Sequence, residues 1–498
     1  MKCQALMLLL LFSCLSPLFA QEKLSKHAVL EDLQHLENQL QRISSYQGLN
    51  GYNYQIDFER YRNTLSSDSI VKTDFGLFLS KSIGKIGDRH AYVKNYNLAD
   101  EKFMPFIIAP FENQVLALQY NSDHKYFDYL HANYPYLTAI NGMKLKLILA
   151  QICPEAIYAP KAAYHARAVK QLRHLEESFA IMNQPLPMTC TFTFSGEKGD
   201  TTVDMSILST ANRKGRWSDQ FAYLDVRESE MNNTAKIAPY FKVDQDEIAY
   251  LRIPKMLHPE DAPNYYQLFH EFMQNIRESK ALIIDVRDNG GGGRELILEL
   301  AKYLVHPDTI QVVNIAQQRS NHNLNEDQKE DMRARFLYEM EALDTEEQAV
   351  AKDFLSDFQP MYDLPENQFS NYYFMLLNGE KLNENGDNYF YNQTVFVLAN
   401  ERSFSAASIL VSTLKNLPNV LTAGVTTDGS SGNSEKFYLP NSKLKVKIST
   451  MVSFQTNGQI LDGFGTAPDM ALERSLEQVL WKEDNQLKQL KELILTKL

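Results

Sequence analysis

Residues 281–305 read ALIIDVRDNGGGGRELILELAKYLV and decide the fold of this chain. The apolar run at the start is typical of a strand that is buried on both faces. The apolar residues at the end recur with helical spacing. Four glycines, residues 290–293, separate the two patterns. A buried strand that leads through a turn into a helix is the unit of a parallel α/β sheet, so the segment predicts an α/β core.

The same unit recurs on either side of this stretch. DEIAYLRIPK (246–255) and NQTVFVLAN (392–400) are strand patterns, whereas APNYYQLFHEFMQNIRES (262–279) and SAASILVSTLKNL (405–417) are helical patterns. Residues 319–388 interrupt the alternation with a polar, acidic segment that is helical early on. We therefore predict a layered core over residues 211–480, with an insertion at about 319–388 and a C-terminal helix over 481–498.

Two further parts precede this core. Leucines recur at helical spacing in residues 29–48 and 74–86, so residues 21–102 are predicted to form an N-terminal helical segment that ends in the turn around His90. Residues 103–210 alternate like strands around one or two helices, with a strong hairpin signal in MTCTFTFSGEKGDTTVDMSIL (188–208). This second part is predicted to be a small compact module.

The first residues, MKCQALMLLLLFSCLSPLFAQEK, have the features of a secretory signal peptide that is cleaved after Ala20. A membrane anchor is the alternative, although the apolar run is short for a span. Cys14 follows Leu-Phe-Ser and weakly resembles a bacterial lipoprotein site. We expect an exported protein, periplasmic or extracellular, that is soluble or tethered by lipid.

Charge and cysteine content exclude some classes of partner. The formal net charge is −12, and nucleic-acid binding needs a basic face. The mature chain keeps Cys153 and Cys190, which form either a disulfide or two buried free thiols. They do not make a zinc site, because no histidine pattern accompanies them. We expect no metal and no cofactor.

The glycine run could bind a phosphate or a transient oxyanion. A P-loop needs Gly-Lys-Ser/Thr at the helix start, but these glycines lead into Arg294 and Glu295. The dinucleotide fingerprint is only half matched, because Glu295 stands where its third glycine belongs. What remains is a set of unhindered backbone N–H groups at a helix start, which suits an oxyanion.

A second junction offers a nucleophile. In VFVLANERSFSAASILV (395–411) a buried strand ends and a helix of small residues begins near Ser405. A serine there can be a simple N-cap, but Ala406 and Ala407 leave room for a substrate beside the hydroxyl. Its base would be His90, in KIGDRHAYV (85–93), and the carboxylates that could orient His90 are Asp462, Asp469 and Asp88.

These motifs together resemble the catalytic core of the carboxy-terminal processing peptidase family, which includes the tricorn core protease. The resemblance covers IAYLRI, LIIDVRDNGGGG, VFVLANERSFSAAS, LTAGVTTDGSSG and LDGFGTAPDMAL in that order, over residues 246–475 without the insertion. YLTAINGMKLKLIL (136–149) resembles the closing part of the PDZ-like module of these peptidases, and GDRHAYV (87–93) resembles the histidine segment of the tricorn-like branch. The resemblance implies a ClpP/crotonase-like α/β core, a PDZ-like domain over 103–210, and a serine endopeptidase that acts on peptides or proteins.

The family pattern assigns roles to individual residues. It implies Ser405 as nucleophile, His90 as base and Asp462, where the branch has a glutamate, as orienter. Backbone N–H groups of Gly290 or Gly291 and of Ala406 would form the oxyanion hole. We also expect the residues that flank the glycine pair, Asn289 and Gly292, to contact the substrate.

One departure keeps other interpretations open. The processing-peptidase branch has a lysine base about 25 residues after its serine, whereas this chain has Ser430 at that place. An inactive relative that binds peptides or an apolar ligand is therefore an alternative. A crotonase-like acyl-transfer enzyme is another, although no basic cluster suggests a coenzyme A pocket. A replacement base among the later lysines is a further possibility: Lys436, Lys443, Lys445 and Lys447.

Overall fold

The structure is a computed structural model that describes residues 22–99, 101–209, 228–320, 323–384, 386 and 388–497. The expected signal peptide, with Cys14 and the cleavage site after Ala20, lies outside the described residues. Within the described part of the chain, no helix has the length and apolar character needed to cross a membrane.

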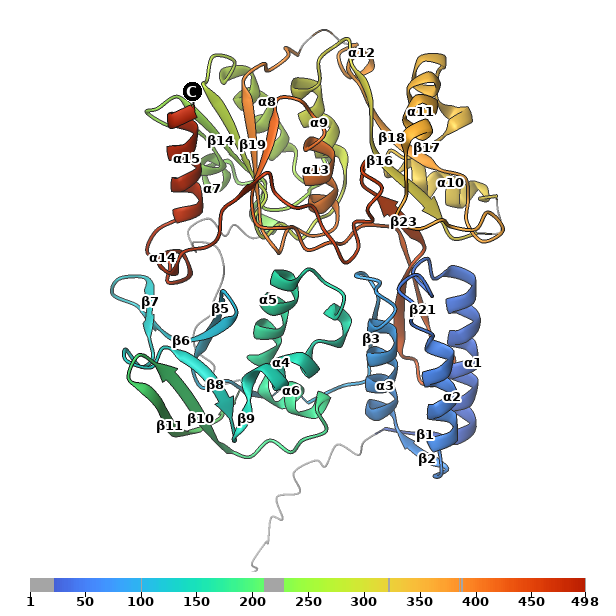
Figure 1. Ribbon diagram of the computed structural model, residues 1–498, viewed down its shortest axis with the longest axis vertical. Coiled ribbons are helices and arrows are strands. Elements are labelled where there is room, and N and C mark those ends of the chain that lie inside the picture. Colours follow the sequence, from blue (N-terminus) through green and yellow to red (C-terminus); the bar gives the residue numbers. More distant parts are fainter. Residues whose placement is uncertain are drawn as a thin grey trace, which may run out of the picture.

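The upper half of the molecule is built around a six-stranded sheet with strand order β13-β14-β15-β19-β20-β24 (Figure 1). All neighbours from β14 onward are parallel, and β13 is antiparallel to β14. The prediction of an α/β core is therefore confirmed. The strands are β13 (Phe241–Val243), β14 (Ile248–Arg252), β15 (Ala281–Asp285), β19 (Thr394–Ala399), β20 (Val420–Gly424) and β24 (Met470–Ala471).

Helices cover both faces of this sheet because its central strands are apolar on both sides. Leu282 and Ile284 of β15 pack into the core on the face of three helices, and Ile283 packs into a second core on the opposite face. Leu490 and Ile494 of the C-terminal helix belong to that second core. The helices of the first face are α8 (Pro263–Asn275), α9 (Glu295–Leu304) and α13 (Ala406–Leu414), and the C-terminal helix is α15 (Asn485–Lys497).

An antiparallel sheet of order β17-β18-β16-β23 stands beside the parallel one. The insertion contributes α10 (Glu326–Arg333) and α11 (Thr345–Asp357), and each begins with a capping box. It then returns as β18, which is largely buried and pairs with β16, so its last part is an internal strand of the core. The strands are β16 (Ile310–Gln318), β17 (Tyr338–Glu339), β18 (Tyr373–Asn378) and β23 (Met451–Phe454).

The N-terminal residues form helices packed on a small sheet below this core. In α1 (Lys26–Ile43), Val29, Leu33, Leu36 and Leu40 share one face and are completely buried. The helices α2 (Tyr54–Thr64) and α3 (Lys72–Gly84) follow. Their sheet has the order β21-β22-β3 and joins distant parts of the chain: β21 (Ser434–Tyr438), β22 (Lys445–Ser449) and β3 (Tyr92–Lys94).

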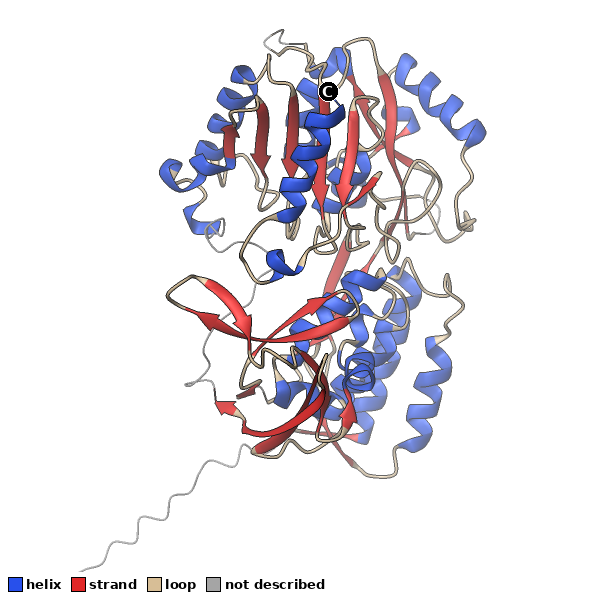
Figure 2. Ribbon diagram, turned by 60° about the vertical axis from the view of Figure 1, so that its left-hand side comes forward, coloured by secondary structure: helices blue, strands red, loops and turns tan. Residues whose placement is uncertain are grey.

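Residues 102–209 form a separate sheet with helices on one side, seen at the lower left of Figure 1 and from another side in Figure 2. Its hairpin β10–β11 lies where the sequence predicts one. The sheet has order β11-β10-β8-β6-β5, with β7 and β9 attached. The elements are β5 (Ile107–Phe111), β6 (Gln114–Asn121), β7 (Tyr126–Tyr129), β8 (Tyr136–Ile140), β9 (Met143–Lys144), β10 (Thr189–Gly196), β11 (Gly199–Ser206), α4 (Leu145–Ile152), α5 (Lys161–Leu172) and α6 (Leu175–Ile181).

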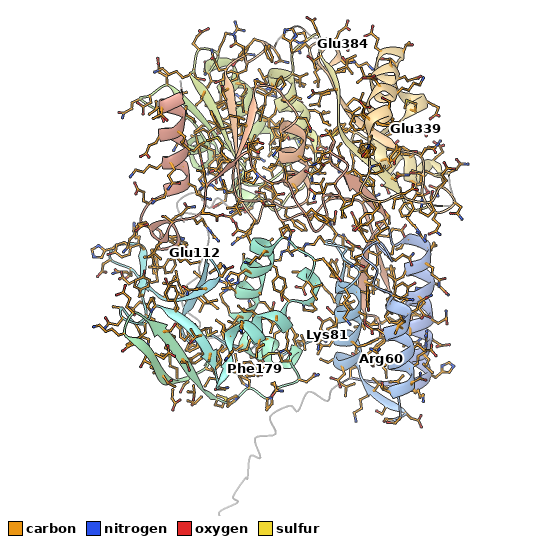
Figure 3. The ribbon with its side chains drawn as sticks, viewed as in Figure 1. Arg60, Lys81, Glu112, Phe179, Glu339 and Glu384 are labelled. Atoms are coloured by element: carbon orange, nitrogen blue, oxygen red, sulfur yellow. The ribbon has the colours of Figure 1, made fainter. Side chains whose placement is uncertain are left out.

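Short elements connect these parts. Lys81 of α3, labelled in Figure 3 near Phe179 of α6, donates a hydrogen bond of 2.9 Å to the carbonyl of Ile181.

The question left open for the cysteines is answered in this structure, where Cys153 and Cys190 are both buried and unpaired. The connecting elements are β1 (Lys23–Ser25), β2 (Ser69–Val71), β4 (Lys102–Phe103), β12 (Leu208–Ser209), α7 (Thr234–Ile237), α12 (Gly379–Leu382), α14 (Leu476–Val479) and four 3-10 turns, η1 (Pro154–Ala156), η4 (Glu228–Glu230), η5 (Ala238–Tyr240) and η6 (Met340–Ala342).

Candidate active site

Ser405 stands at the turn between β19 and α13 in a strained conformation. Its φ of +55° lies in the left-handed region, which a residue with a side chain seldom adopts. Its backbone N–H donates a hydrogen bond of 2.9 Å to the Ser430 hydroxyl, and its own hydroxyl caps no backbone group of the helix. The expectation that Ser405 is more than an N-cap thus agrees with its geometry.

The glycine loop after β15 lies directly against this turn. The Phe404 N–H donates a hydrogen bond of 2.9 Å to the carbonyl of Asn289, which joins the ends of two neighbouring strands. A Cβ added to Gly291 would lie 2.7 Å from the Ser405 Cβ and 3.0 Å from the Ala406 nitrogen. With a φ of +87° as well, this position requires glycine because two backbone segments meet there.

The structure corrects part of the expected oxyanion hole. The Gly291 N–H already donates a hydrogen bond of 2.8 Å to the Asn289 Oδ1, so it is not open to a substrate. Among the described residues, no hydrogen bond is donated by the N–H of Gly290 or of Ala406. Gly290 is also exposed, and a Cβ there would meet no atom within 4 Å. The open donors beside Ser405 are therefore those of Gly290 and Ala406.

Of the two residues expected to contact substrate, Asn289 serves the loop in this structure, whereas Gly292 is exposed and its contact with substrate stays a prediction. Asn289 is completely buried, and its Nδ2 donates a hydrogen bond of 2.9 Å to the carbonyl of Ile253. Its side chain is thus used at both ends to hold the glycine loop, and the expectation of substrate contact is wrong for it. Gly292 packs against the backbone of Met256, and a Cβ added to Gly292 would lie 1.8 Å from the Met256 carbonyl oxygen.

The imidazole of His90 lies beside the hydroxyl of Ser405. Its Nε2 is 3.2 Å from the Ser405 Oγ, and its ring centroid is 4.9 Å from that of Phe404. The His90 and Ala91 N–H groups donate hydrogen bonds of 2.9 and 3.1 Å to the Asp88 Oδ1. Asp88 also accepts 2.6 Å hydrogen bonds from the N–H and hydroxyl of Ser449. Asp88 therefore fixes the backbone of the histidine turn.

Of the three expected carboxylates, Asp462 is the one that faces Nδ1 of His90, the ring nitrogen that does not contact Ser405. Its Oδ1 is 4.0 Å from the His90 Nδ1, which is longer than a hydrogen bond. Within the described parts of the chain, this Nδ1 is buried and has no hydrogen-bond partner. The Asp462 Oδ2 accepts hydrogen bonds from the N–H and hydroxyl of Ser431, at 3.0 and 2.7 Å.

Asp469 is excluded as the orienter. It accepts hydrogen bonds from the N–H and hydroxyl of Thr422, at 2.9 and 2.8 Å, and pairs with Lys415 at 2.9 Å. Its carboxylate is therefore committed to joining β20 to the loop before β24.

Burial shapes the electrostatics around the histidine turn. Burial and the neighbouring charge of Asp462 raise the pKa of Asp88 above its usual value, although hydrogen bonds from Ser449 oppose the shift. The phenol of Tyr46 is fully buried nearby, and its pKa is raised well above the usual value by burial and by the charges of Asp462 and Asp88. Two carboxyl groups and a phenol thus lie together behind His90.

Sequence reasoning did not find the charged group on the other side of the histidine turn. Arg89 and Arg167 both bind Asp428, with nitrogen–oxygen distances of 3.0 Å and 2.9 Å, and Arg167 lies 5.0 Å from the Phe404 ring centroid. Arg89 and Asp428 stand inside quoted motifs, but their pairing spans 339 residues. No local pattern could have revealed it.

A cavity opens next to these groups. It has a volume of about 700 Å³ and is lined by His90, Arg89, Arg167 and Phe404 together with residues of α3, α6 and the segment after His90. A second cavity of about 710 Å³ lies between α5 and the loop after Asp462 and includes Phe464. In the described residues, no group of three histidine, cysteine or acidic side chains is placed to hold a metal ion.

The comparisons with known proteins agree with this geometry. Residues 247–472 match peptidase family S41. No curated protein matches the sequence. The fold is similar to mature CPAF complexed with lactacystin, with 17% identity, a TM-score of 0.63 and coverage of 94% of this chain and 98% of that chain. It is similar to a second structure of mature CPAF, also at 17% identity, with a TM-score of 0.60 and coverage of 94% and 97%.

A photosystem II D1 C-terminal processing protease is more distant. It has 12% identity and a TM-score of 0.41 over 92% of this chain and 97% of that chain, which is too low to support inference. The resemblance of the core motifs to this family is confirmed by the family match, which spans the parallel sheet and both strand-end turns. Residues 247–472 form a serine-peptidase domain of family S41.

Proposed function

We propose that this protein is an exported endopeptidase that cleaves peptide bonds through an acyl-enzyme on Ser405. The observation that carries the proposal is the 3.2 Å contact between the His90 Nε2 and the Ser405 Oγ, at a serine with a φ of +55°. A hydroxyl held in a strained turn beside an imidazole is the arrangement that nucleophilic catalysis requires.

In the proposed first step, His90 takes the proton from the Ser405 hydroxyl as the oxygen attacks the peptide carbonyl. The negative charge that develops on the carbonyl oxygen is held by the N–H groups of Gly290 and Ala406, which have no other acceptor among the described residues. The imidazolium then gives its proton to the leaving amine, and the acyl group stays on Ser405. A water molecule, deprotonated by His90, releases the acid and restores the serine.

Asp462 is the proposed orienter of His90. Its Oδ1 lies 4.0 Å from the Nδ1 and its negative charge favours the imidazolium that forms during attack. A hydrogen bond needs an approach of about 1 Å, which is common when an unliganded site closes on substrate. The two hydrogen bonds from Ser431 hold the carboxylate in place until then.

We further propose that the sheet of residues 102–209 is the PDZ-like module and that the preceding helices belong to the catalytic unit. The support is spatial, because α6 and α3 both line the cavity that contains His90. Export is proposed from residues 1–20 alone.

A fluorophosphonate probe tests the proposal on the mature chain from Gln21. Labelling that is abolished by Ser405→Ala and by His90→Ala would establish a serine activated by histidine. Labelling lost with Ser405→Ala and kept with His90→Ala would assign the base to another residue. A folded protein with no labelling would favour a relative that binds peptides without cleaving them.

A further inference from the structure

The three-stranded sheet β21-β22-β3 carries an unusual concentration of positive charge on one face. Pairing places Lys436, Lys447 and Tyr92 in one row across the strands and Tyr438, Lys445 and Lys94 in the next. Residues two apart in a strand share a face, so both rows point to the same side. These six residues are called the lysine face below.

The opposite face of this sheet is buried. Val93, Val446 and Ile448 pack in one core with α1 and α3, and the ring of Phe437 lies 6.0 Å from that of His35 on α1. The lysine face is therefore the outer side of the sheet. Lys94 and Lys436 are exposed, and Tyr438 is 55% exposed.

The lysines of this face have no close ion-pair partner. In the part of the chain that the structure describes, none of the four forms an ion pair with a carboxylate within 4.0 Å. Three of them approach tyrosine rings instead. The Lys94 and Lys447 nitrogens are 4.7 and 5.9 Å from the Tyr92 centroid, and that of Lys445 is 5.9 Å from the Tyr438 centroid. Burial lowers the pKa of Lys447, helped by the charges of Lys436 and Lys94 and opposed by the negative charge of Asp88. Such a cluster of lysines is unexpected in a chain with a net charge of −12.

The lysine face is continuous with the active-site cavity. Tyr92, Lys94 and Lys447 line the cavity of about 700 Å³ that also contains His90. The arginines of the cavity are already paired with Asp428. Glu155 and Glu177 line it as well, but they come from η1 and α6 and not from this sheet. A chain that passes Ser405 through the cavity would therefore continue across the lysines.

We propose that the lysine face binds an acidic segment of the substrate, so that the enzyme selects peptides with aspartate or glutamate residues to one side of the bond cleaved at Ser405. Clustered lysines without ion-pair partners create a positive potential at the surface. This potential attracts carboxylates, because few negative charges lie nearby to cancel it. This inference rests on the proposed peptidase function.

Binding to an inactive enzyme tests the proposal without requiring turnover. The probes are a fluorescent peptide with a run of glutamates and its matched peptide with glutamines, bound to the full mature chain with Ser405→Ala. The test variant is Lys436→Glu with Lys445→Glu. The control is Lys198→Glu with Lys352→Glu, which makes the same change of charge at exposed lysines outside this sheet.

We expect the glutamate peptide to bind about tenfold more tightly than the glutamine peptide at low salt, since several exposed charge pairs each add a small amount. The preference should disappear in the test variant, persist in the control variant, and weaken as salt screens the charges. Equal binding of both peptides, or equal loss in test and control variants, would overturn the proposal.

A second arm separates a peptide from a membrane as the source of the negative charge. Vesicles of phosphatidylcholine with phosphatidylglycerol are offered to the same variants. Binding to anionic vesicles through Lys436 and Lys445, together with no preference between the two peptides, would also overturn the proposal. Failure of the proposed peptidase function would be seen separately, as a parent protein that fluorophosphonate does not label.

Discussion

Ser405 and His90, the proposed nucleophile and base, are positioned by two different regions of the molecule. Ser405 and the glycine loop come from the ends of β19 and β15, which are adjacent parallel strands of one sheet. His90 comes from the N-terminal region, and its turn is held through Asp88 by hydrogen bonds from Ser449, more than 300 positions later in the chain.

This difference shows two ways in which a site can be made rigid. The strand-end turns are fixed by short backbone contacts within one core, such as the 2.9 Å bond from Phe404 to Asn289. The histidine turn is fixed by one buried carboxylate, Asp88, which accepts four hydrogen bonds. The first region depends on the fit of two backbone segments, and the second depends on a network of buried hydrogen bonds.

The largest expected effect comes from removing either half of the reacting pair. Ser405→Ala and His90→Ala should each lower kcat by about 10⁴-fold or more, measured with a cleavable peptide. The double variant should be no worse than either single one, because the two residues act as a unit. If the loss of kcat in the double variant equals the product of the two single losses, the residues act independently.

Asp462→Asn should have the next largest effect. We expect kcat to fall about 10³-fold, which is less than for His90→Ala, because the carboxylate lies 4.0 Å from the imidazole and acts through it. Ser431→Ala, which removes one hydrogen bond to Asp462, serves as the graded comparison and should lose less. An Asp462→Asn enzyme with the parent's kcat would assign the orienting role elsewhere.

Gly291→Val should damage the strand-end region selectively. The added Cβ would lie 2.7 Å from the Ser405 Cβ, so the serine and Ala406 must move and kcat should fall about 10²- to 10³-fold. Gly290→Ala is the matched substitution, because its Cβ meets no atom within 4 Å and its N–H remains; it should lose far less. Equal losses for the two variants would contradict the close approach.

The smallest expected effect is on the stability of the fold and concerns Asp88 in the turn that carries His90. The raised pKa of Asp88 means that the fold prefers its protonated form, so the parent should lose stability as pH rises from about 4 toward that raised pKa. Asp88→Asn should lack this decline in urea unfolding measured between pH 4 and 7.

Asp57 provides the control of opposite sign for that measurement. Although burial opposes the change, hydrogen bonds from Lys85 and Tyr52 lower the pKa of Asp57. Its contribution is present above its unfolded pKa and is lost as pH falls, so Asp57→Asn should remove stability at neutral pH. Parallel pH profiles for the two variants would contradict the assigned directions.

The two regions also differ in how well the sequence predicted them. The strands at 281–285 and 394–399, their turns and the closeness of Gly291 to Ser405 follow from local patterns, because parallel strands end at one edge of a sheet. The sequence does not predict that the Gly291 N–H donates a hydrogen bond to the Asn289 side chain, because a run of glycines does not indicate which N–H group remains available to a substrate.

The environment of His90 was less accessible to sequence reasoning. The motifs suggested three carboxylates for one role, but only tertiary contacts assign Asp88 to the backbone of the turn and Asp469 to Thr422. The strand β18 was missed for a similar reason, because a polar insertion hides a short apolar segment that is stabilised by pairing with β16. Long-range pairing decided each of these cases.

The pairing of β3 with β22 also bears on the order in which the site can form during folding. Asp88 and His90 belong to the first fifth of the chain, yet Ser449 and Asp462, which hold and face them, are among its last residues to be made. In any partly synthesised chain that stops before these residues, the turn of His90 therefore lacks the groups that hold and face it. We therefore expect the proposed pair of Ser405 and His90 to assemble only when the last part of the chain has folded onto the first.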